Sequence, residues 1–273
     1  MYITNNPKVA VIAENNGVDR IWIDLETLGK EERQKGMNTV KSSHCIEDIY
    51  KIKPLLSKAK LLVRVNPWNC NSEKEINSVI EAGADLIMLP MWKSVDEVSN
   101  FLSAVDKRCK TILLLETKDA VECLDEVLAK GGMDEIHIGL NDLHLLYGLT
   151  FMFELLSNGT VEMLCKKINS AGLPYGFGGI ARLGEGLLPA EKVIMEHYRL
   201  GSTRAILSRS FCDTAIITDE KEIERNFFEN MKQLRKYELK IENAKEEYED
   251  NKLIVKQKVD EIVKAIRRKK DVG

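Results

Sequence analysis

Short, nearly continuous apolar runs recur through the first two thirds of this chain, and they constrain its fold more than any other feature. Turn-forming residues bound each run, and none of the runs alternates strictly between apolar and polar positions. Strands that are covered on both faces have this pattern, because neither face meets water. The clear runs occupy residues 20–25, 61–66, 85–90, 111–117, 135–140, 175–180 and 204–211, and a weaker candidate occupies residues 38–44.

Amphipathic helical patterns separate most of these runs. Several of them end at a glycine suited to a helix C-cap, such as Gly83, Gly131, Gly172 and Gly201. Alternation of strands and helices, with eight strands in all, predicts an α/β fold of the (β/α)8 TIM-barrel type, and a doubly wound open sheet is the alternative. The predicted helices occupy residues 47–59, 72–82, 95–105, 119–129, 160–171 and 189–200.

The composition changes at residue 219. All 6 prolines and all but one of the 17 glycines precede this point, and the segment that follows is rich in charges of both signs. Apolar residues recur there at spacings of three and four, which predicts one long amphipathic helix or a helix pair broken near Asn251. We therefore divide the chain into a barrel domain, residues 1–218, and a helical tail, residues 219–273. A barrel surrounded by its own helices offers the tail little room, so we expect the tail to form a homo-oligomer contact.

Composition excludes several classes of function. The 273 residues carry 40 Lys+Arg against 43 Asp+Glu, a formal net charge of -3, which gives no electrostatic footprint for nucleic acid. No apolar stretch reaches the roughly 18 residues that a membrane span needs, and the first residues lack the pattern of a secretory signal. The 6 cysteines form no CxxC pair. We expect a cytoplasmic protein that acts on a small molecule, without nucleic-acid or membrane partners.

Two carboxylates follow neighbouring strands at the end of the barrel where such folds place their chemistry. Glu116 ends one predicted strand and Asp142 follows the next. Mg²⁺ commonly takes one or two carboxylates and completes its shell with water and substrate. The pair could therefore hold Mg²⁺ or Mn²⁺, and the alternative is that both are solvated strand-end carboxylates.

Other polar residues lie at the same end of the predicted barrel. Arg64 sits between two valines of a buried strand, where it either forms a structural ion pair or clamps a substrate carboxylate. Glu26 follows the first predicted strand. His44 is either an acid–base group or a cap for the next helix. The turn that begins at Gly139 can present backbone N–H groups to an anion.

The glycine-rich segment 176–179 lies where barrels often bind phosphate, although a tight strand bend is the favoured explanation for it. His144 could face the mouth of the barrel. His137 and His197 have the positions of structural histidines.

Four motifs, in this order and spacing, resemble the HpcH/HpaI aldolase and citrate lyase beta-subunit family. They are VRVN at 63–66, AGADLIMLP at 82–90, ETKDAV at 116–121 and IGLNDL at 138–143. The sequence DLE at 24–26, followed by Lys30 and Arg33, is closer to the citrate lyase side. The resemblance covers about residues 17–212 and implies a pyruvate-kinase-like barrel, in agreement with the strand pattern.

The resemblance also implies roles for individual residues. Glu116 and Asp142 would bind Mg²⁺ or a similar ion, and Arg64 would hold the oxygens of the substrate. Backbone amides near Gly139, Leu140 and Asn141 would help to bind its carboxylate. Members of the family form trimers or hexamers, often with a C-terminal helix packed on a neighbouring barrel.

These observations predict a metal-dependent carbon–carbon lyase or aldolase that acts on a 2-oxo acid, such as pyruvate or oxaloacetate, through an enolate bound to the metal. Arg64 would stabilise the enolate charge, and His44, Glu26 or a metal-bound water would move the proton. One alternative is a citryl- or malyl-CoA-type lyase. Another is a non-catalytic barrel scaffold. The departures from the family pattern at Thr27, Met91 and Leu114 favour it slightly, and the presence of Arg64, Glu116 and Asp142 together argues against it.

Overall fold

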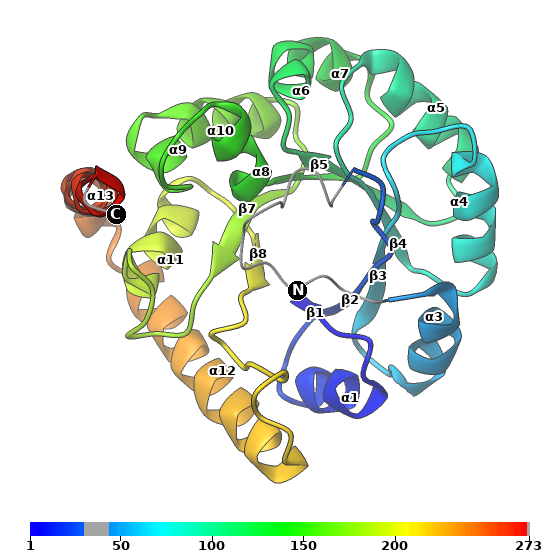
Figure 1. Cartoon of the computed structure of the whole chain (residues 1–273), viewed down its shortest axis with the longest axis horizontal. Coiled ribbons are helices and arrows are strands. Elements are labelled where there is room, and N and C mark those ends of the chain that lie inside the picture. Colours follow the sequence, from blue (N-terminus) through cyan, green and yellow to red (C-terminus); the bar gives the residue numbers. More distant parts are fainter. Residues whose placement is uncertain (30–43, 272–273) are drawn as a thin grey trace.

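A computed structural model of the chain describes residues 1–29 and 44–271 and shows a ring of parallel strands surrounded by helices (Figure 1). The strands pair in chain order, each parallel to the next. Hydrogen bonds close the ring, since the Leu207 N–H donates to the Met1 carbonyl at 2.8 Å and the Met1 amino group donates to the Ala205 carbonyl at 2.9 Å. The predicted (β/α)8 barrel is therefore confirmed. Its strands are β1 (Tyr2–Ile3), β2 (Arg20–Asp24), β3 (Lys60–Arg64), β4 (Leu86–Leu89), β5 (Lys110–Leu115), β6 (Glu135–Ile138), β7 (Tyr175–Ile180) and β8 (Arg204–Leu207).

One strand differs from the sequence expectation. The first strand is β1, whose two residues pair with Ile21 and Trp22 of β2. The weak candidate at 38–44 lies outside the described residues except for His44, which is in no strand. With β1 included, the eight strands are complete without that segment. A strand of two residues is too short to show a hydrophobic period, so no pattern in the sequence marks it.

The helices agree with most of the expected ranges. Pro54 lies in a single 3-10 turn that ends the first expected helix early, and the expected helix at 119–129 is split at Cys123. None of the helices in residues 1–29 and 44–271 combines the length and hydrophobicity needed to cross a bilayer. The helices of the barrel are α1 (Pro7–Asn15), α3 (Ile46–Ile52), η1 (Lys53–Leu55), α4 (Ser72–Glu81), α5 (Val95–Val105), α6 (Lys118–Glu122), α7 (Leu124–Lys130), α8 (Leu140–Leu146), α9 (Glu154–Ser157), α10 (Thr160–Ser170) and α11 (Ala190–Arg199).

Alternate strand residues separate into two apolar clusters. One cluster lies inside the ring, and the other fills the space between strands and helices. Neighbouring residues of a strand point to opposite faces, so a strand buried on both faces must be apolar at almost every position. This explains the continuous runs in the sequence. The inner cluster consists of Trp22, Leu62, Leu86, Met88, Ile112 and Leu114.

A buried ion group lies inside the ring at the N-terminal ends of the strands. Glu135 accepts two hydrogen bonds from Arg20, both at 2.7 Å, and one at 2.8 Å from Arg204 Nε. Burial alone would raise the pKa of Glu135, but the two guanidinium groups hold it below its usual value. This group joins β2, β6 and β8 across the ring, because a carboxylate so far from water requires cationic partners.

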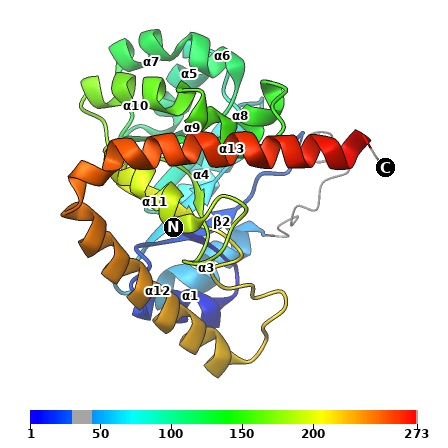
Figure 2. The same ribbon diagram turned by 90° about the vertical axis from the view of Figure 1, so that its left-hand side faces the viewer.

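The tail packs on the chain's own barrel. Helix α12 (Glu220–Glu242) lies against α1 and α11, and α13 (Tyr248–Asp271) crosses α9 and α11 (Figure 2). The apolar stripe of α12 is buried there, including Phe227 and Leu234, and that of α13 includes Val259. The stripe is thus covered within one chain. Contact of the outer faces with another subunit, as a trimer or hexamer, stays a prediction.

The tail is a helix pair, but its break is not near Asn251. The chain leaves the helix after Glu242 and turns through η2 (Lys245–Glu247) before α13. Asn251 lies inside α13 and is 1% exposed. Its side-chain amide donates to Glu196 Oε1 at 2.9 Å and to the Lys192 carbonyl at 3.1 Å. A polar residue in the stripe therefore marks a buried contact with α11 rather than a helix end.

We expect Gly176→Ala to destabilise the barrel. A Cβ at this position would lie 2.3 Å from the Arg204 carbonyl oxygen, so strand β8 would have to move. Forced overpacking of this kind costs roughly 1–3 kcal/mol, measured as a loss of unfolding free energy in urea. Gly179→Ala is the matched control, because its Cβ would lie 3.3 Å from the Ile206 carbonyl oxygen. Equal stability of the two variants would contradict the close approach.

We expect acid to loosen α13. Hydrogen bonds from Lys252 and Lys166 lower the pKa of Glu162 from the usual 4.5 to about 2, and Lys252 lies on α13. Since the folded-state pKa is lowered, this contact stabilises the docked helix above pH 4.5 and is lost as the pH falls towards 2. The protection factors of the α13 amides, which correct for the pH dependence of intrinsic exchange, should fall over that range. Glu162→Gln should show lower protection factors already at neutral pH, whereas Glu261→Gln on the exposed face should not.

Candidate active site

Five charged side chains converge at the C-terminal ends of the strands. Asp24 ends β2 and Glu26 follows it, Arg64 ends β3, Glu116 follows β5, and Asp142 lies in the first turn of α8. The parallel barrel brings them together because all strands end at the same rim. The structure thus places the sequence candidates Glu26, Arg64, Glu116 and Asp142 in one region.

Arg64 forms an ion pair within this group. Its Nε and Nη2 donate to the two carboxylate oxygens of Asp24 at 2.8 and 2.9 Å, and Nη2 lies 3.2 Å from Glu26 Oε2. Burial alone would lower the pKa of Arg64, but Asp24 and Glu26 reverse this and raise it. The guanidinium also lies 5.1 Å from the centre of the Trp22 ring. Arg64 therefore does form an ion pair, which fixes its position at the mouth, and its contact with a substrate stays a prediction.

Glu116 is the most constrained carboxylate of the site. It is 2% exposed, and its Oε1 accepts a 3.1 Å hydrogen bond from the Met91 N–H. Burial and the neighbouring charge of Asp142 raise the pKa of Glu116 well above its usual value, although Arg64 opposes them. A Cβ at Gly139 would lie 2.7 Å from Glu116 Oε2. Position 139 is therefore a glycine because the carboxylate lies directly against its backbone.

The segment at 139–142 contributes its backbone in a defined way. The Gly139 N–H donates to the Leu115 carbonyl at 2.9 Å and so belongs to the sheet. The Leu140 side chain is buried, whereas Asn141 is exposed. Helix α8 begins at Leu140, so the N–H groups of Leu140 and Asn141 have no partner within the helix. Three backbone amides were expected to bind the substrate, and those of Leu140 and Asn141 are available for this because they form no bond within the helix.

His44 and Glu26 lie on the β2 side of the mouth. His44 Nδ1 accepts a hydrogen bond from the Asp24 N–H at 3.0 Å, so a neutral His44 ring carries its proton on Nε2. Cys45, rather than His44, is the residue that precedes α3. Glu26 is 3% exposed and contacts Arg64. Glu26 lies just after a strand, as expected, whereas His44 neither ends a strand nor caps α3 and is held by a backbone group of β2.

Sequence reasoning did not assign the residues that support this site. Asp24 is the bidentate partner of Arg64, and the DLE motif was its only signal. Asn66 Oδ1 accepts N–H groups from Thr27 at 2.9 Å and Leu28 at 3.0 Å, while its amide donates to Glu75 at 2.8 Å. It thereby anchors the loop that carries Glu26. A polar residue just after a buried strand was the signal available for Asn66.

The remaining sequence candidates either make structural contacts or fall outside the residues that the structure describes. Lys30 and Arg33 fall in the segment that is not described. His137 bonds to the Gly178 carbonyl at 3.2 Å and His144 to the Leu140 carbonyl at 3.2 Å, both buried. The glycines at 176 and 178 meet Arg204 and Leu140 closely, which supports strand packing as the reason for them.

The chain is a (β/α)8 barrel with a buried cluster of carboxylates and an arginine at its C-terminal rim, the end at which barrels of this type carry their functional residues. A family model described as HpcH/HpaI aldolase/citrate lyase matches residues 1–152, more than half of the chain. The chain belongs to this family. A comparison with curated protein sequences finds no match.

Solved structures show the same fold at low sequence identity. An HpcH/HpaI aldolase from Desulfitobacterium hafniense DCB-2 is 17% identical with a TM-score of 0.57, over 76% of this chain and 84% of its own. A family protein from Burkholderia cenocepacia J2315 is 14% identical with a TM-score of 0.58, over 82% and 94%. The citrate synthase SbnG is 17% identical with a TM-score of 0.55, over 76% and 84%.

We expect Asp24→Asn to destabilise the protein by about 3 kcal/mol, since it leaves the buried Arg64 with less compensating charge. The measurement is the free energy of unfolding in urea. Asp125→Asn removes the partner of Lys167 from an exposed pair, and such pairs contribute about 0–1 kcal/mol. Equal losses in the two variants would show that Arg64 does not depend on Asp24.

Proposed function

We propose that the chain is a divalent-metal-dependent carbon–carbon lyase or aldolase that acts on a 2-oxo acid, with Glu116 and Asp142 as the metal ligands. The observation that carries this proposal is the buried Glu116 carboxylate, close enough to Asp142 for their charges to oppose each other. The names of the structural relatives support the reaction class, because aldolase and citrate synthase both denote carbon–carbon bond chemistry.

The charges at the mouth fit a divalent cation. Four carboxylates, those of Asp24, Glu26, Glu116 and Asp142, accompany Arg64, which already binds the first two. Among these carboxylates, Glu116 is buried beside Asp142, and their charges oppose each other. Among the described residues no three His, Cys, Asp or Glu side chains form a metal cluster. A pair of oxygen ligands is the set that Mg²⁺ uses together with water and substrate.

A divalent cation bound at this site supplies Lewis-acid polarisation of a carbonyl group. Arg64 adds a fixed positive charge beside the same position. Within the described part of the chain its Nη1 takes part in no hydrogen bond, so its N–H groups can bind the substrate oxygen on which charge develops. Asp24 holds the guanidinium in place for this contact. The N–H groups of Leu140 and Asn141, at the start of the helix that carries Asp142, suit the substrate carboxylate.

Proton transfer is assigned to the β2 side of the mouth. Neutral His44 carries its proton on Nε2, because the Asp24 N–H occupies Nδ1. In this form Nε2 can donate a hydrogen bond to a substrate oxygen, whereas transfer of a proton from His44 would require the imidazolium form. Glu26 is ion-paired with Arg64 and is the second candidate for moving the proton. Both remain candidates for the group that acts on the partner hydroxyl.

We expect Glu116→Gln and Asp142→Asn each to abolish Mn²⁺ binding and to reduce the metal-dependent cleavage of oxaloacetate at least about 100-fold, since each removes a ligand charge. Binding is measured by calorimetry and cleavage by pyruvate release. Asp119→Asn, an exposed carboxylate on α6, is the matched control and should behave as wild type. Full Mn²⁺ affinity in both variants would disprove the ligand assignment.

A further inference from the structure

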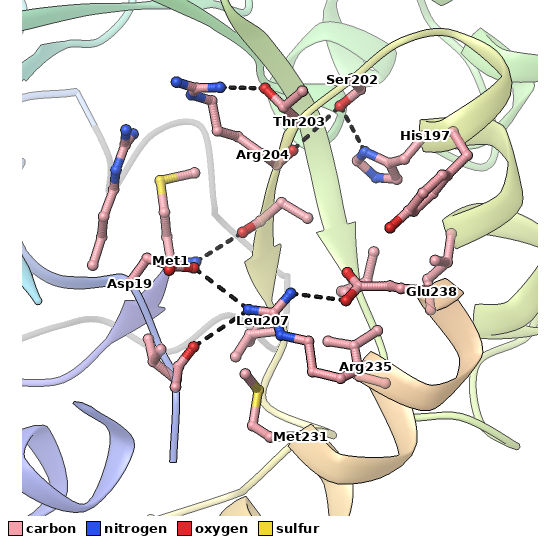
Figure 3. Close-up of a pocket in the computed structure, with 18 of the residues that line it drawn as sticks. Met1, Asp19, His197, Ser202, Thr203, Arg204, Leu207, Met231, Arg235 and Glu238 are labelled. Atoms are coloured by element: carbon pink, nitrogen blue, oxygen red, sulfur yellow. Dashed lines mark hydrogen bonds and ion pairs between the residues drawn. The ribbon is translucent and has the colours of Figure 1, made fainter. Parts of the chain in front are cut away.

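A cavity of about 660 Å³ lies away from the site just described (Figure 3). It is enclosed by β8, α11, α12 and the turn before β2. Arg20 and Arg204 line it, and they are the first residues of β2 and β8. The cavity thus begins at the N-terminal end of β8, away from Glu116 and Asp142, and extends along this strand to Leu207. Its volume falls within the roughly 300–1,000 Å³ of sites for small molecules.

Apolar side chains form the walls between the strand and the tail. Leu207 contributes from β8, Ile194 from α11, and Met231 and Leu234 from α12. These four side chains are at most 8% exposed, so the cavity is bounded by well-packed residues. The walls suit a ligand with an apolar body.

The floor of the cavity carries an excess of positive charge. Arg20 and Arg204 share one carboxylate, that of Glu135. Two guanidinium groups against one carboxylate leave one positive charge uncompensated within this group. Within the described residues no hydrogen bond involves Arg20 Nε. A ligand carboxylate at the floor would complete the charge balance.

The opposite charge prevails at the rim. Arg235 donates to Glu238 Oε2 at 2.8 Å and lies 3.6 Å from Asp19 Oδ2 (Figure 3). One guanidinium stands between two carboxylates, so the rim disfavours a second anionic group. The two ends together favour a ligand with a single negative charge.

His197 forms part of the wall as a buried ring. It is 5% exposed, and its Nδ1 bonds to Ser202 Oγ at 2.7 Å. The ring stacks on Phe177 with centroids 3.8 Å apart, which fixes its orientation. Its Nε2 is shielded from water, so the ring closes the wall and this nitrogen is not a contact for a ligand.

We propose that this cavity binds a small monocarboxylic acid with an apolar body. The carboxylate lies at Arg20 and Arg204, and the apolar body packs between Leu207 and Leu234. The site is separate from the chemistry at the mouth and does not depend on it.

The test is calorimetric titration of the whole chain with naphthalene-1-acetate and with its uncharged match, naphthalene-1-acetamide. We expect the carboxylate to bind at least about tenfold more tightly, which is the effect of one charge-assisted hydrogen bond. Leu234→Trp fills the cavity and should abolish binding. Leu239→Trp places the same side chain on an exposed position of α12 and should leave binding unchanged. Ala205→Leu fills the cavity from β8 if Leu234→Trp does not fold.

Three results would overturn the proposal. The first is equal affinity for the acetate and the acetamide, and the second is undiminished binding in a folded cavity-filling variant. The third is loss of binding in Glu116→Gln, which would place the acid at the mouth of the barrel. Unchanged binding in Glu116→Gln, together with its loss in Leu234→Trp, supports the proposal whatever the catalytic activity proves to be.

Discussion

The pairing of charges inside the ring of strands is the constraint on which the rest of this structure depends. The interior has an ionic group at each end, Arg20 and Arg204 with Glu135 at one, and Arg64 with Asp24 and Glu26 at the other. An apolar layer that includes Trp22 and Leu62 separates them. Charges held so far from water are tolerated only in such groups, so the ion pairs fix which strand residues face inward and at what height.

The two ionic groups offer different charges to a ligand. At the floor, Arg20 and Arg204 share the single carboxylate of Glu135, whereas at the mouth the buried carboxylate of Glu116 lies beside that of Asp142. These local charges are the physical basis for proposing a metal ion beside Glu116 and an organic anion beside Arg204. One barrel would thereby offer two sites of different chemistry, separated by the apolar layer. The raised pKa of Glu116 reflects its burial together with the neighbouring charge of Asp142.

The helical tail packs on the barrel and also forms part of the cavity. Helix α12 covers the outside of the barrel next to β8 and supplies one wall of the cavity. Helix α13 is held to α11 by Asn251 and to α10 by the contact of Lys252 with Glu162. Because these contacts are polar, they specify where the helix docks, while the apolar stripe provides most of the buried surface. The cavity exists only because the tail returns to its own barrel.

The sequence alone determined the kind of fold and the rim on which the chemistry would lie. Buried strands and amphipathic helices are recognised from the hydrophobic period of their own residues. The helix expected at 95–105, for example, is found as α5. The ends of the buried strands then located Arg64, Glu116 and Asp142 near one another, although their function remains a proposal. Tertiary structure alone decided the rest. The two-residue strand β1 has no period, the partnership of Asp24 with Arg64 depends on strand register, and the position of Asn251 depends on what α11 presents to it. The cavity likewise arises from three elements distant in the chain, because such contacts are set by packing in space and leave no local pattern in the sequence.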